Sequence, residues 1–290
     1  MNFCDTNDPQ VQELAQKFRG GPSGPRSDVE FAIAAFNYVR DEIKYTILHN
    51  WSVPVSFTLA TRKGNCGTKA CLLVALFRAG GLKAEFTVER INTSRMFFIV
   101  PTFATGRCNN SRSIHFGTTV FLNGKWIRLD PTVDTALAIG LSGAVGDYFK
   151  TSFDGTSHGT YGGGKCDGDY QQLSTLDKHM LKKSRITRQV RECFNLSFEF
   201  ARQYGEEYKT EEALRQRVEK HLWMHHADLV QDVLSNRAKK EGQDPSSVVP
   251  SSSVKNDSNS ASQQNNWTYG YSDIQVPSLL PPQVFLKSKL

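Results

Sequence analysis

The stretch GNCGTKACLLVALFRAGGL, residues 64–82, directs the interpretation of the whole chain. Its middle part, residues 71–77, is apolar at every position, which is typical of a helix buried on all sides at the centre of a domain. The two glycines near its end favour termination of this helix, so we expect a helix over residues 66–79. Cys66 therefore lies where a loop enters a buried helix.

The position of Cys66 suits a nucleophile. A thiol at a helix N-terminus faces unpaired backbone N–H groups and the positive end of the helix dipole, and both favour the reactive thiolate. The same N–H groups could hold a developing oxyanion. Gly64 and Gly67 allow a tight turn and leave room for substrate. Cys71 lies about 140° further around the helix, so we expect it in the core, whereas the plainer interpretation of Cys66 is one more small buried residue.

A predicted hairpin places a histidine beside a carboxylate. The Asn-Gly pair at 123–124, between two apolar runs, is the strongest short signal for a two-residue turn. Such a turn pairs Leu122 with Lys125, and because side chains alternate with a period of two, His115 and Asp130 become diagonal neighbours on one face. Their Cβ atoms are then roughly 7–8 Å apart, within reach of an imidazole and a carboxylate. An Asp that orients a His beside a thiol is the arrangement of a catalytic triad.

Each of these residues also has a plainer interpretation. A histidine near a strand end is commonly a surface residue, and Asp130 before Pro131 is a usual way to open a turn. Asp134 is a competing carboxylate, but it lies beyond Pro131, where strand pairing should have ended. Other histidines without a comparable geometric argument are His158, His221, His225 and His226.

A glycine-rich segment over residues 155–168 contains a motif that imitates a nucleotide site. Residues 159–165, GTYGGGK, fit the first seven positions of a phosphate-binding loop. However, Cys166 replaces the Ser or Thr that would hold magnesium, and Gly168 disfavours the helix that should follow. We therefore interpret the segment as a mobile lid over the thiol site.

Ordered blocks of this sequence, together spanning about residues 27–135, resemble the transglutaminase-like superfamily, which has a papain-like thiol fold. By this resemblance Cys66 is the nucleophile, His115 is the general base and acid, and Asp130 orients His115. The blocks are residues 39–45 (VRDEIKY), 63–70 (KGNCGTKA) and 75–82 (ALFRAGGL), followed by His115, the hairpin at 121–126 and Asp-Pro-Thr at 130–132.

The sequence also departs from this family. The family commonly follows its histidine with Ala-Trp-x-Glu, whereas residues 116–119 here are FGTT, so the family's substrate preference does not carry over. The β-sandwich domains of large animal transglutaminases and acidic clusters suited to their calcium sites do not appear. We therefore predict an enzyme that is independent of calcium and of any other cofactor.

The predicted fold class is α+β, since helices come first and strands follow. We expect a papain-like transglutaminase core, with the central helix that carries Cys66 packed on an antiparallel sheet, and a C-terminal helical pair. The strands are expected at 84–90, 96–100, 118–122 and 125–129. Ser27 or Asp28 should cap a first helix whose buried face carries Phe31, Ile33, Ala34, Phe36 and Val39.

The chain divides into four parts by composition. These are a polar N-terminal segment (1–26), the catalytic core (27–170), a helical extension (171–240) and a tail (241–290). The extension shows helical periodicity over 171–204 and 210–238. The tail is rich in Ser, Asn, Gln and Pro and cannot bury enough apolar surface to offset its ordering entropy, so we expect it to be disordered.

Composition and charge argue against several classes of protein. The net charge is +6, and the densest basic stretch, residues 178–191, contains no Phe, Tyr or Trp to stack on bases, so we expect no nucleic-acid partner. The longest apolar run is too short to span a membrane. The first thirty residues lack the apolar region of a secretory signal, so the six cysteines are expected to be free thiols.

The chain ends in Ser288-Lys289-Leu290, which matches a peroxisomal signal that an import receptor reads. We therefore predict a peroxisomal location and that receptor as a partner. Coenzyme A thioesters are plentiful acyl donors there, which makes acyl-CoA a candidate substrate. The predicted function is amide-bond formation between a small activated acyl donor, a thioester or an amide, and an amine acceptor, through an acyl-enzyme on Cys66. Arylamine acetyltransferases, which share the triad, support this by analogy. Two alternatives stay open: a cysteine peptidase or amidase of the same fold, and a binding module with a disabled thiol site.

Overall fold

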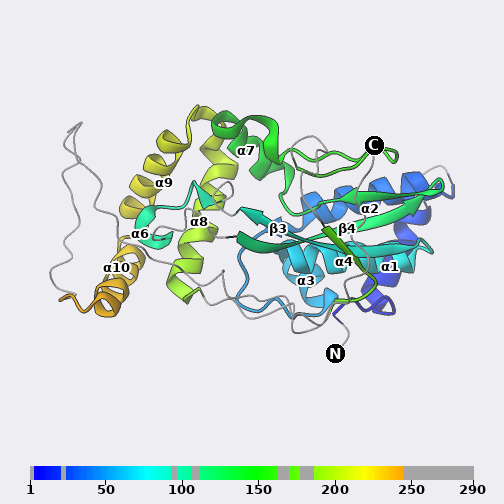
Figure 1. Cartoon of the computed structure of the whole chain (residues 1–290), viewed down its shortest axis with the longest axis horizontal. Coiled ribbons are helices and arrows are strands. Elements are labelled where there is room, and N and C mark those ends of the chain that lie inside the picture. Colours follow the sequence, from blue (N-terminus) through cyan, green and yellow to red (C-terminus); the bar gives the residue numbers. More distant parts are fainter. Residues whose placement is uncertain are drawn as a thin grey trace.

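The computed structural model describes residues 3–20, 24–92, 97–105, 112–161, 170–176 and 186–244, and it contains both helices and a β-sheet (Figure 1). The α+β class predicted from the sequence is confirmed. The elements in chain order are α1 (Pro9–Gly20), α2 (Asp28–Glu42), β1 (Lys44–Tyr45), α3 (Val55–Thr61), β2 (Lys63–Gly64), α4 (Cys66–Ala79), β3 (Ala84–Asn92), α6 (Thr102–Thr105), β4 (Arg112–Leu122), β5 (Lys125–Leu129), α7 (Thr135–Val145), η1 (Gly146–Phe149), β6 (Tyr170–Leu173), α8 (Arg188–Tyr204), η2 (Gly205–Glu207), α9 (Glu211–His225) and α10 (Ala227–Glu241).

Helix α4 is the centre of the fold, as its apolar sequence predicted. Its residues from Cys66 through Phe77 are all buried. Helices α1, α2 and α3 and strands β3 and β4 all pack against it. A Cβ atom on Gly80 would lie 2.1 Å from the Phe31 ring, so close packing at the end of α4 requires glycine there. Burial of a Leu or Phe side chain contributes about 1.5–3 kcal/mol, which makes α4 the main anchor of this core.

Helix α2 begins where the sequence predicted, with a capping box between Ser27 and Glu30. Its buried face differs slightly from the prediction: Ala32 and Ala35 are buried, while Ile33 and Ala34 are only half-buried. The face is therefore rotated, because α2 packs on α4 rather than on the sheet. Helix α1 was not predicted, and it buries Val11 and Ala15 against the same core.

The main sheet has four antiparallel strands in the order β5-β4-β3-β6. The hairpin between β4 and β5 has the predicted register, with Leu122 opposite Lys125. Asn123 and Gly124 both have positive φ, 49° and 82°, as a type I′ turn requires. Sheet register is thus fixed at the point from which the positions of His115 and Asp130 were derived.

Two predicted secondary-structure elements were wrong in part. The strand expected at 96–100 is not a strand over its described residues, since Phe97 is helical and residues 98–100 form a turn and a bend, and this short apolar run packs in the second core rather than in the sheet. Residues 170–173, expected to begin a helix, form β6 and pair with β3. The secondary structure of a short run without a clear period depends on the segments that it packs or pairs with, and these lie elsewhere in the chain.

The C-terminal helices predicted from the sequence are present, but they number three within the described residues. The helix expected over 210–238 is interrupted at His226, whose backbone is not helical, and this separates α9 from α10. In Figure 1 helices α8, α9 and α10 gather at one end of the molecule, away from α1 and α2. They form a second hydrophobic core with α7 and residues 97–104. No helix in the described part of the chain is long and apolar enough to cross a membrane.

Candidate active site

Cys66 is the first residue of α4, and the backbone around it is held by reciprocal capping bonds. The Asn65 side chain accepts a bond from the Thr68 N–H (3.1 Å), and the Thr68 hydroxyl accepts one from the Asn65 N–H (3.0 Å). Gly64 must be glycine, because a Cβ there would lie 2.8 Å from the Thr68 hydroxyl oxygen. Cys66 is a free thiol with 7% of its surface exposed. It therefore lies at the end of a rigid, buried helix, as predicted, and Cys71 lies in the core.

His115 and Asp130 form a buried pair at the end of the hairpin. His115 Nε2 and Asp130 Oδ2 are 2.5 Å apart. Strand β5 ends at Leu129, and Asp130 turns away from the sheet because its backbone N–H donates to the Gly159 carbonyl (2.8 Å). The second carboxylate oxygen of Asp130 accepts a bond from the Thr132 N–H (2.9 Å). Both oxygens are thus engaged, which fixes the orientation of the carboxylate.

The electrostatics of this pair favour charge on both partners. Burial alone would lower the pKa of His115, but the negative charge of Asp130 and hydrogen bonds with Asp130 and Cys66 hold it well above its ordinary value. Burial would likewise raise the pKa of Asp130, but the charge of His115 and hydrogen bonds from His115 and Thr132 lower it. Both shifts favour an imidazolium–carboxylate pair.

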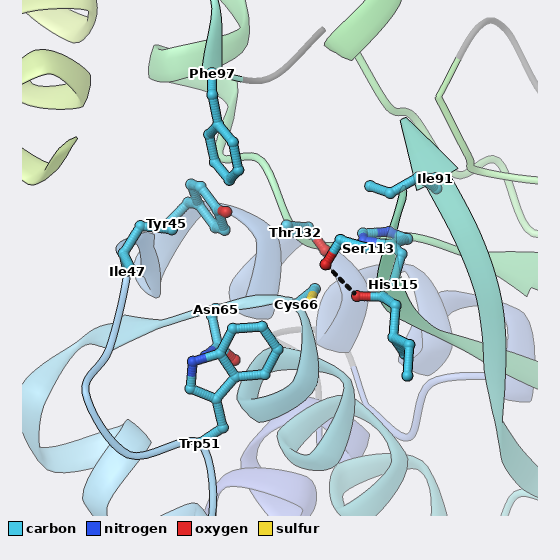
Figure 2. Close-up of a pocket in the computed structure, with 11 residues that line it drawn as sticks. Tyr45, Ile47, Trp51, Asn65, Cys66, Ile91, Phe97, Ser113, His115 and Thr132 are labelled. Carbon is cyan, nitrogen blue, oxygen red and sulfur yellow. Dashed lines mark hydrogen bonds between the residues drawn. The ribbon is translucent and has the colours of Figure 1, made fainter. Parts of the chain in front are cut away.

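The predicted residues Cys66, His115 and Asp130 are brought together as one hydrogen-bonded chain. Because Nε2 of His115 is bonded to Asp130, Nδ1 is the ring nitrogen left for the Cys66 thiol. Figure 2 shows Cys66 and His115 side by side on the wall of one cavity. A thiol, an imidazole and an orienting carboxylate in this order can carry out nucleophilic acyl chemistry.

The cavity beside Cys66 has a volume of about 30 Å³, room for roughly two water molecules. None of the described residues that line it is Asp, Glu, Lys or Arg, so away from His115 it suits a narrow, uncharged group. Its aromatic walls were not predicted from the sequence, because they come from loops far apart in the chain. The lining residues are Tyr45, Ile47, Trp51, Asn65, Cys66, Ile91, Phe97, Ser113, Ile114, His115 and Thr132.

The cavity lies between the two hydrophobic cores. Cys66 belongs to the core around α4, whereas Tyr45 and Ile47 belong to the core of the C-terminal helices. The rings of Tyr45 and Phe198 of α8 are 5.2 Å apart, and the Asn195 side chain of α8 accepts a bond from the Ile47 N–H (2.8 Å). The C-terminal helices therefore support one wall of the site.

Lys69, one turn after the thiol, connects α4 with the turn that carries Asp130. It is fully buried, and its ammonium donates to the carbonyls of Arg40 (3.0 Å), Ile43 (2.6 Å) and Thr132 (2.9 Å). Burial lowers the pKa of Lys69 to about 7. The contact with Thr132 matters for the site, because the N–H of the same residue holds Asp130. No sequence pattern pointed to this lysine, which stands in an apolar helix.

The competing residues have other roles. Asp134 caps α7 and forms a buried ion pair with Arg202 of α8 (2.8 Å), so it does not contact His115. His158 accepts a bond from the Arg128 N–H. The rings of His221, His225 and His226 lie near one another on α9 and at its end. Asp130 is thus the carboxylate that meets the histidine.

The described part of the glycine-rich segment is attached to β5. Gly159, the first glycine of the phosphate-loop motif, bonds to the backbone of Arg128 and Asp130, and the ring of Tyr161 lies 5.8 Å from that of His115. Burial, with the charge of Asp130 adding to it, raises the pKa of Tyr161 well above its ordinary value. Tyr161 thus shields the pair from solvent, while residues 162–168, on which the lid prediction also rests, lie outside the described residues.

Cys66, Cys71 and Cys193 are free thiols. Within the described residues, no group of three or more His, Cys, Asp or Glu side chains is arranged to hold a metal ion.

Comparison with known proteins identifies the family of the segment that carries this site. Residues 12–131 match the model of the transglutaminase-like superfamily. The family resemblance and the papain-like core predicted from the sequence are confirmed, and the match begins within α1. No curated protein matches the chain.

Two solved structures resemble part of the chain. One is a proposed cysteine protease from Cytophaga hutchinsonii, with 20% identity and a TM-score of 0.32, over 46% of this chain and 39% of that one. The other is a proposed protease from Parabacteroides distasonis, with 11% identity and a TM-score of 0.32, over 58% of this chain and 26% of that one. The match thus spans less than half of either structure.

Proposed function

We propose that this chain, which has a transglutaminase-like core, is a thiol acyltransferase that joins an activated acyl group to an amine through a thioester on Cys66. The observation that carries the proposal is the buried hydrogen-bonded chain from Cys66 through His115 to Asp130. The raised pKa of His115 stabilises an imidazolium beside the sulfur, and an imidazolium is the partner that favours a thiolate.

The proposed reaction has two half-reactions. The Cys66 thiolate attacks the donor carbonyl, and the His115 imidazolium gives its proton to the leaving thiol or amine as the carbon–sulfur or carbon–nitrogen bond breaks. An amine then attacks the thioester, and the neutral His115 takes its proton as Cys66 leaves. Asp130 stays ionised and orients His115 throughout. Water in place of the amine would make the same site a hydrolase.

The cavity favours a small, uncharged acyl group. Apart from Cys66 and His115, the described residues that line this cavity of about 30 Å³ carry no charge, so it fits a short acyl chain better than a charged or branched one. We propose a thioester of coenzyme A as the donor, since Ser288-Lys289-Leu290 would deliver the chain to peroxisomes. These three residues lie outside the described residues.

Intact-mass spectrometry tests the central proposal. Wild-type protein incubated with a short-chain acyl-CoA should gain the mass of one acyl group, and an added amine should remove it as an amide. The Cys66→Ala variant should gain nothing, while Cys71→Ala, which changes a buried thiol on the same helix, should react like wild type. Release to the free acid in the presence of amine would instead identify a hydrolase. Failure of iodoacetamide to label Cys66 would indicate a disabled site.

The donor class is tested against an amide. The same assay with a glutamine-containing peptide in place of acyl-CoA should give little adduct, because a thiolate is acylated less readily by a primary amide than by a thioester. A faster reaction with the peptide would contradict the proposed donor. We also propose that calcium is not required, so excess chelator should leave the rate unchanged.

The proposed location is tested separately. A fluorescent reporter joined to the last twelve residues should be punctate and coincide with a peroxisomal marker, and removal of Leu290 should make it diffuse. A diffuse signal from the intact fusion would contradict the peroxisomal location, and with it the argument for coenzyme A thioesters.

A further inference from the structure

Asn65 precedes the proposed nucleophile, and only the oxygen of its side-chain amide takes part in a hydrogen bond within the described residues. Its Oδ1 accepts the bond from the Thr68 N–H that caps α4, and this donor fixes which end of the amide carries the oxygen. The opposite end, Nδ2, is buried and has no hydrogen-bond partner among the residues that the structure describes. The residue as a whole is 1% exposed and lines the cavity. Figure 2 shows Asn65 beside Cys66, on the side where Trp51 lies.

An unpartnered buried amide N–H group is uncommon in folded proteins and calls for an explanation. Capping does not supply one, because Ser, Thr or Asp would cap α4 equally well through an oxygen alone. What distinguishes Asn from these residues is the pair of N–H donors on Nδ2. These donors belong to the residue next to Cys66, and no acceptor in the described part of the chain uses them.

We propose that Nδ2 of Asn65 donates a hydrogen bond to the oxyanion that forms when Cys66 attacks a carbonyl. This inference rests on the proposed function and adds a catalytic residue to it. As the carbon–sulfur bond forms, the carbonyl π electrons move to oxygen, and the resulting negative charge is stabilised by Nδ2–H together with backbone N–H groups at the start of α4. When the leaving group departs with the proton of His115, the carbonyl reforms and the bond weakens. Asn65 therefore stabilises charge without exchanging a proton.

A serine variant separates donation from capping. Asn65→Ser keeps a capping oxygen and should retain the unfolding midpoint of wild type, whereas Asn65→Ala loses both functions and should unfold more easily. We expect Asn65→Ser to lower kcat for acylation about 100-fold with little change in KM, the effect of removing one oxyanion donor.

Alkylation provides the internal control. Iodoacetamide reacts with the Cys66 thiolate by displacement at a saturated carbon and forms no oxyanion, so Asn65→Ser should be alkylated at the wild-type rate. An aldehyde analogue of the donor, which forms a tetrahedral adduct on sulfur, should bind the variant more weakly than wild type.

The outcomes distinguish this inference from the proposed function. If wild-type protein forms no acyl adduct from any donor, the proposed function fails. If wild type is acylated and Asn65→Ser is acylated equally fast, only the role of Asn65 is wrong. A parallel loss of alkylation and acylation in Asn65→Ser would also contradict it, because Asn65 would then act on the thiolate and not on the oxyanion.

Discussion

The protonation of His115 depends on two neighbours, Asp130 and Cys66. Burial opposes the imidazolium, and the carboxylate at 2.5 Å, together with Cys66, outweighs burial because the charges interact where water is excluded. Asp130 is held in place for this because its oxygens are occupied by His115 and the Thr132 N–H. The position of this carboxylate is therefore a main determinant of the charge on His115.

Replacing Asp130 with Asn should make stability lose its dependence on the charge of His115. Folding raises the pKa of His115, so this group contributes its full stabilisation of the folded state below its unfolded pKa of about 6.5. That contribution disappears as the pH rises through the folded pKa. The lowered pKa of Asp130 contributes above about pH 3.9 and is lost as pH falls through its folded value. We expect Asp130→Asn to cost about 1–3 kcal/mol of unfolding free energy near pH 6, and less at alkaline pH.

Urea unfolding across pH 5 to 10 measures this difference, with Asp232→Asn on the exposed side of α10 as the control. In a second measurement, the NMR resonance of labelled His115 should titrate at lower pH in Asp130→Asn than in wild type. A stability difference that does not change with pH would contradict the pairing.

The sequence was sufficient to place His115 beside Asp130, but it did not predict the residues that hold and enclose this pair. A two-residue turn determines the register of both strands, so the relation of His115 to Asp130 followed from side-chain alternation alone. Asn65 belongs to the sequence block 64–82, but the sequence does not show that its Oδ1 accepts the Thr68 N–H bond and that its Nδ2 is therefore left over. Trp51 and Tyr161 reach the site through loop geometry, which no local pattern encodes.

At the scale of elements, α4 contributes both the thiol and the connection to the carboxylate. Lys69 follows Cys66 by one turn and donates to carbonyls before β1 and after β5. Three donor contacts require the ammonium form, although burial lowers the pKa of Lys69 to about 7. The helix therefore fixes the spacing between the nucleophile and the turn at Thr132.

Replacing Lys69 with Met should keep the packing volume but leave three buried carbonyls without a donor. We expect a loss of about 3 kcal/mol or more in unfolding free energy, together with a lower kcat as the turn at Asp130 loosens. Because the folded pKa lies below the unfolded value, wild type should also gain stability relative to the variant from about pH 7 towards pH 10.4. Lys17→Met, which changes an exposed residue of α1, is the matched control. Equal stability of Lys69→Met and wild type would contradict the stabilising role of the Lys69 hydrogen bonds.

Element predictions succeeded where a segment carried its own period or cap. Helices α2 and α4 have clear caps and long apolar faces, and both begin where the sequence indicated. Strand β6 and the segment 97–100 are short, and each is determined by a partner distant in the chain. The break between α9 and α10 falls within a continuous helical pattern, so periodicity alone did not reveal it.

At the scale of the whole molecule, the cavity depends on contact between two hydrophobic cores. The core around α4 supplies the thiol, and the core of α7 to α10 supports Tyr45 and Phe97 opposite to it. The rings of Phe97 and Phe194 of α8 are 4.9 Å apart. The shape of the cavity is therefore a property of the assembled molecule, whereas Cys66, His115 and Asp130 lie in the segment that matches the transglutaminase-like family.

The ion pair between Arg202 of α8 and Asp134 joins α8 to the start of α7, within the second core and close to Tyr45 of the cavity. Arg202 contacts both carboxylate oxygens (3.0 and 2.8 Å) and also donates to the Tyr45 carbonyl (2.7 Å). Asp134 is fully buried, so Arg202→Met should leave an uncompensated charge and cost about 3–5 kcal/mol of unfolding free energy. Tyr45 should also lose its restraint, so that KM for the acyl donor rises more than kcat falls.

A double-mutant cycle tests this connection. Asp134→Asn keeps the helix cap but removes the charge, so the double variant Asp134→Asn with Arg202→Met should be more stable than Arg202→Met alone, with a coupling energy of about 1–3 kcal/mol. Glu199→Gln controls for the exposed contact that Arg202 also makes. Urea unfolding gives the unfolding free energy of wild type, of the two single variants and of the double variant. Additive losses would show that the two residues act independently, and an unchanged KM in Arg202→Met would show that α8 does not shape the cavity.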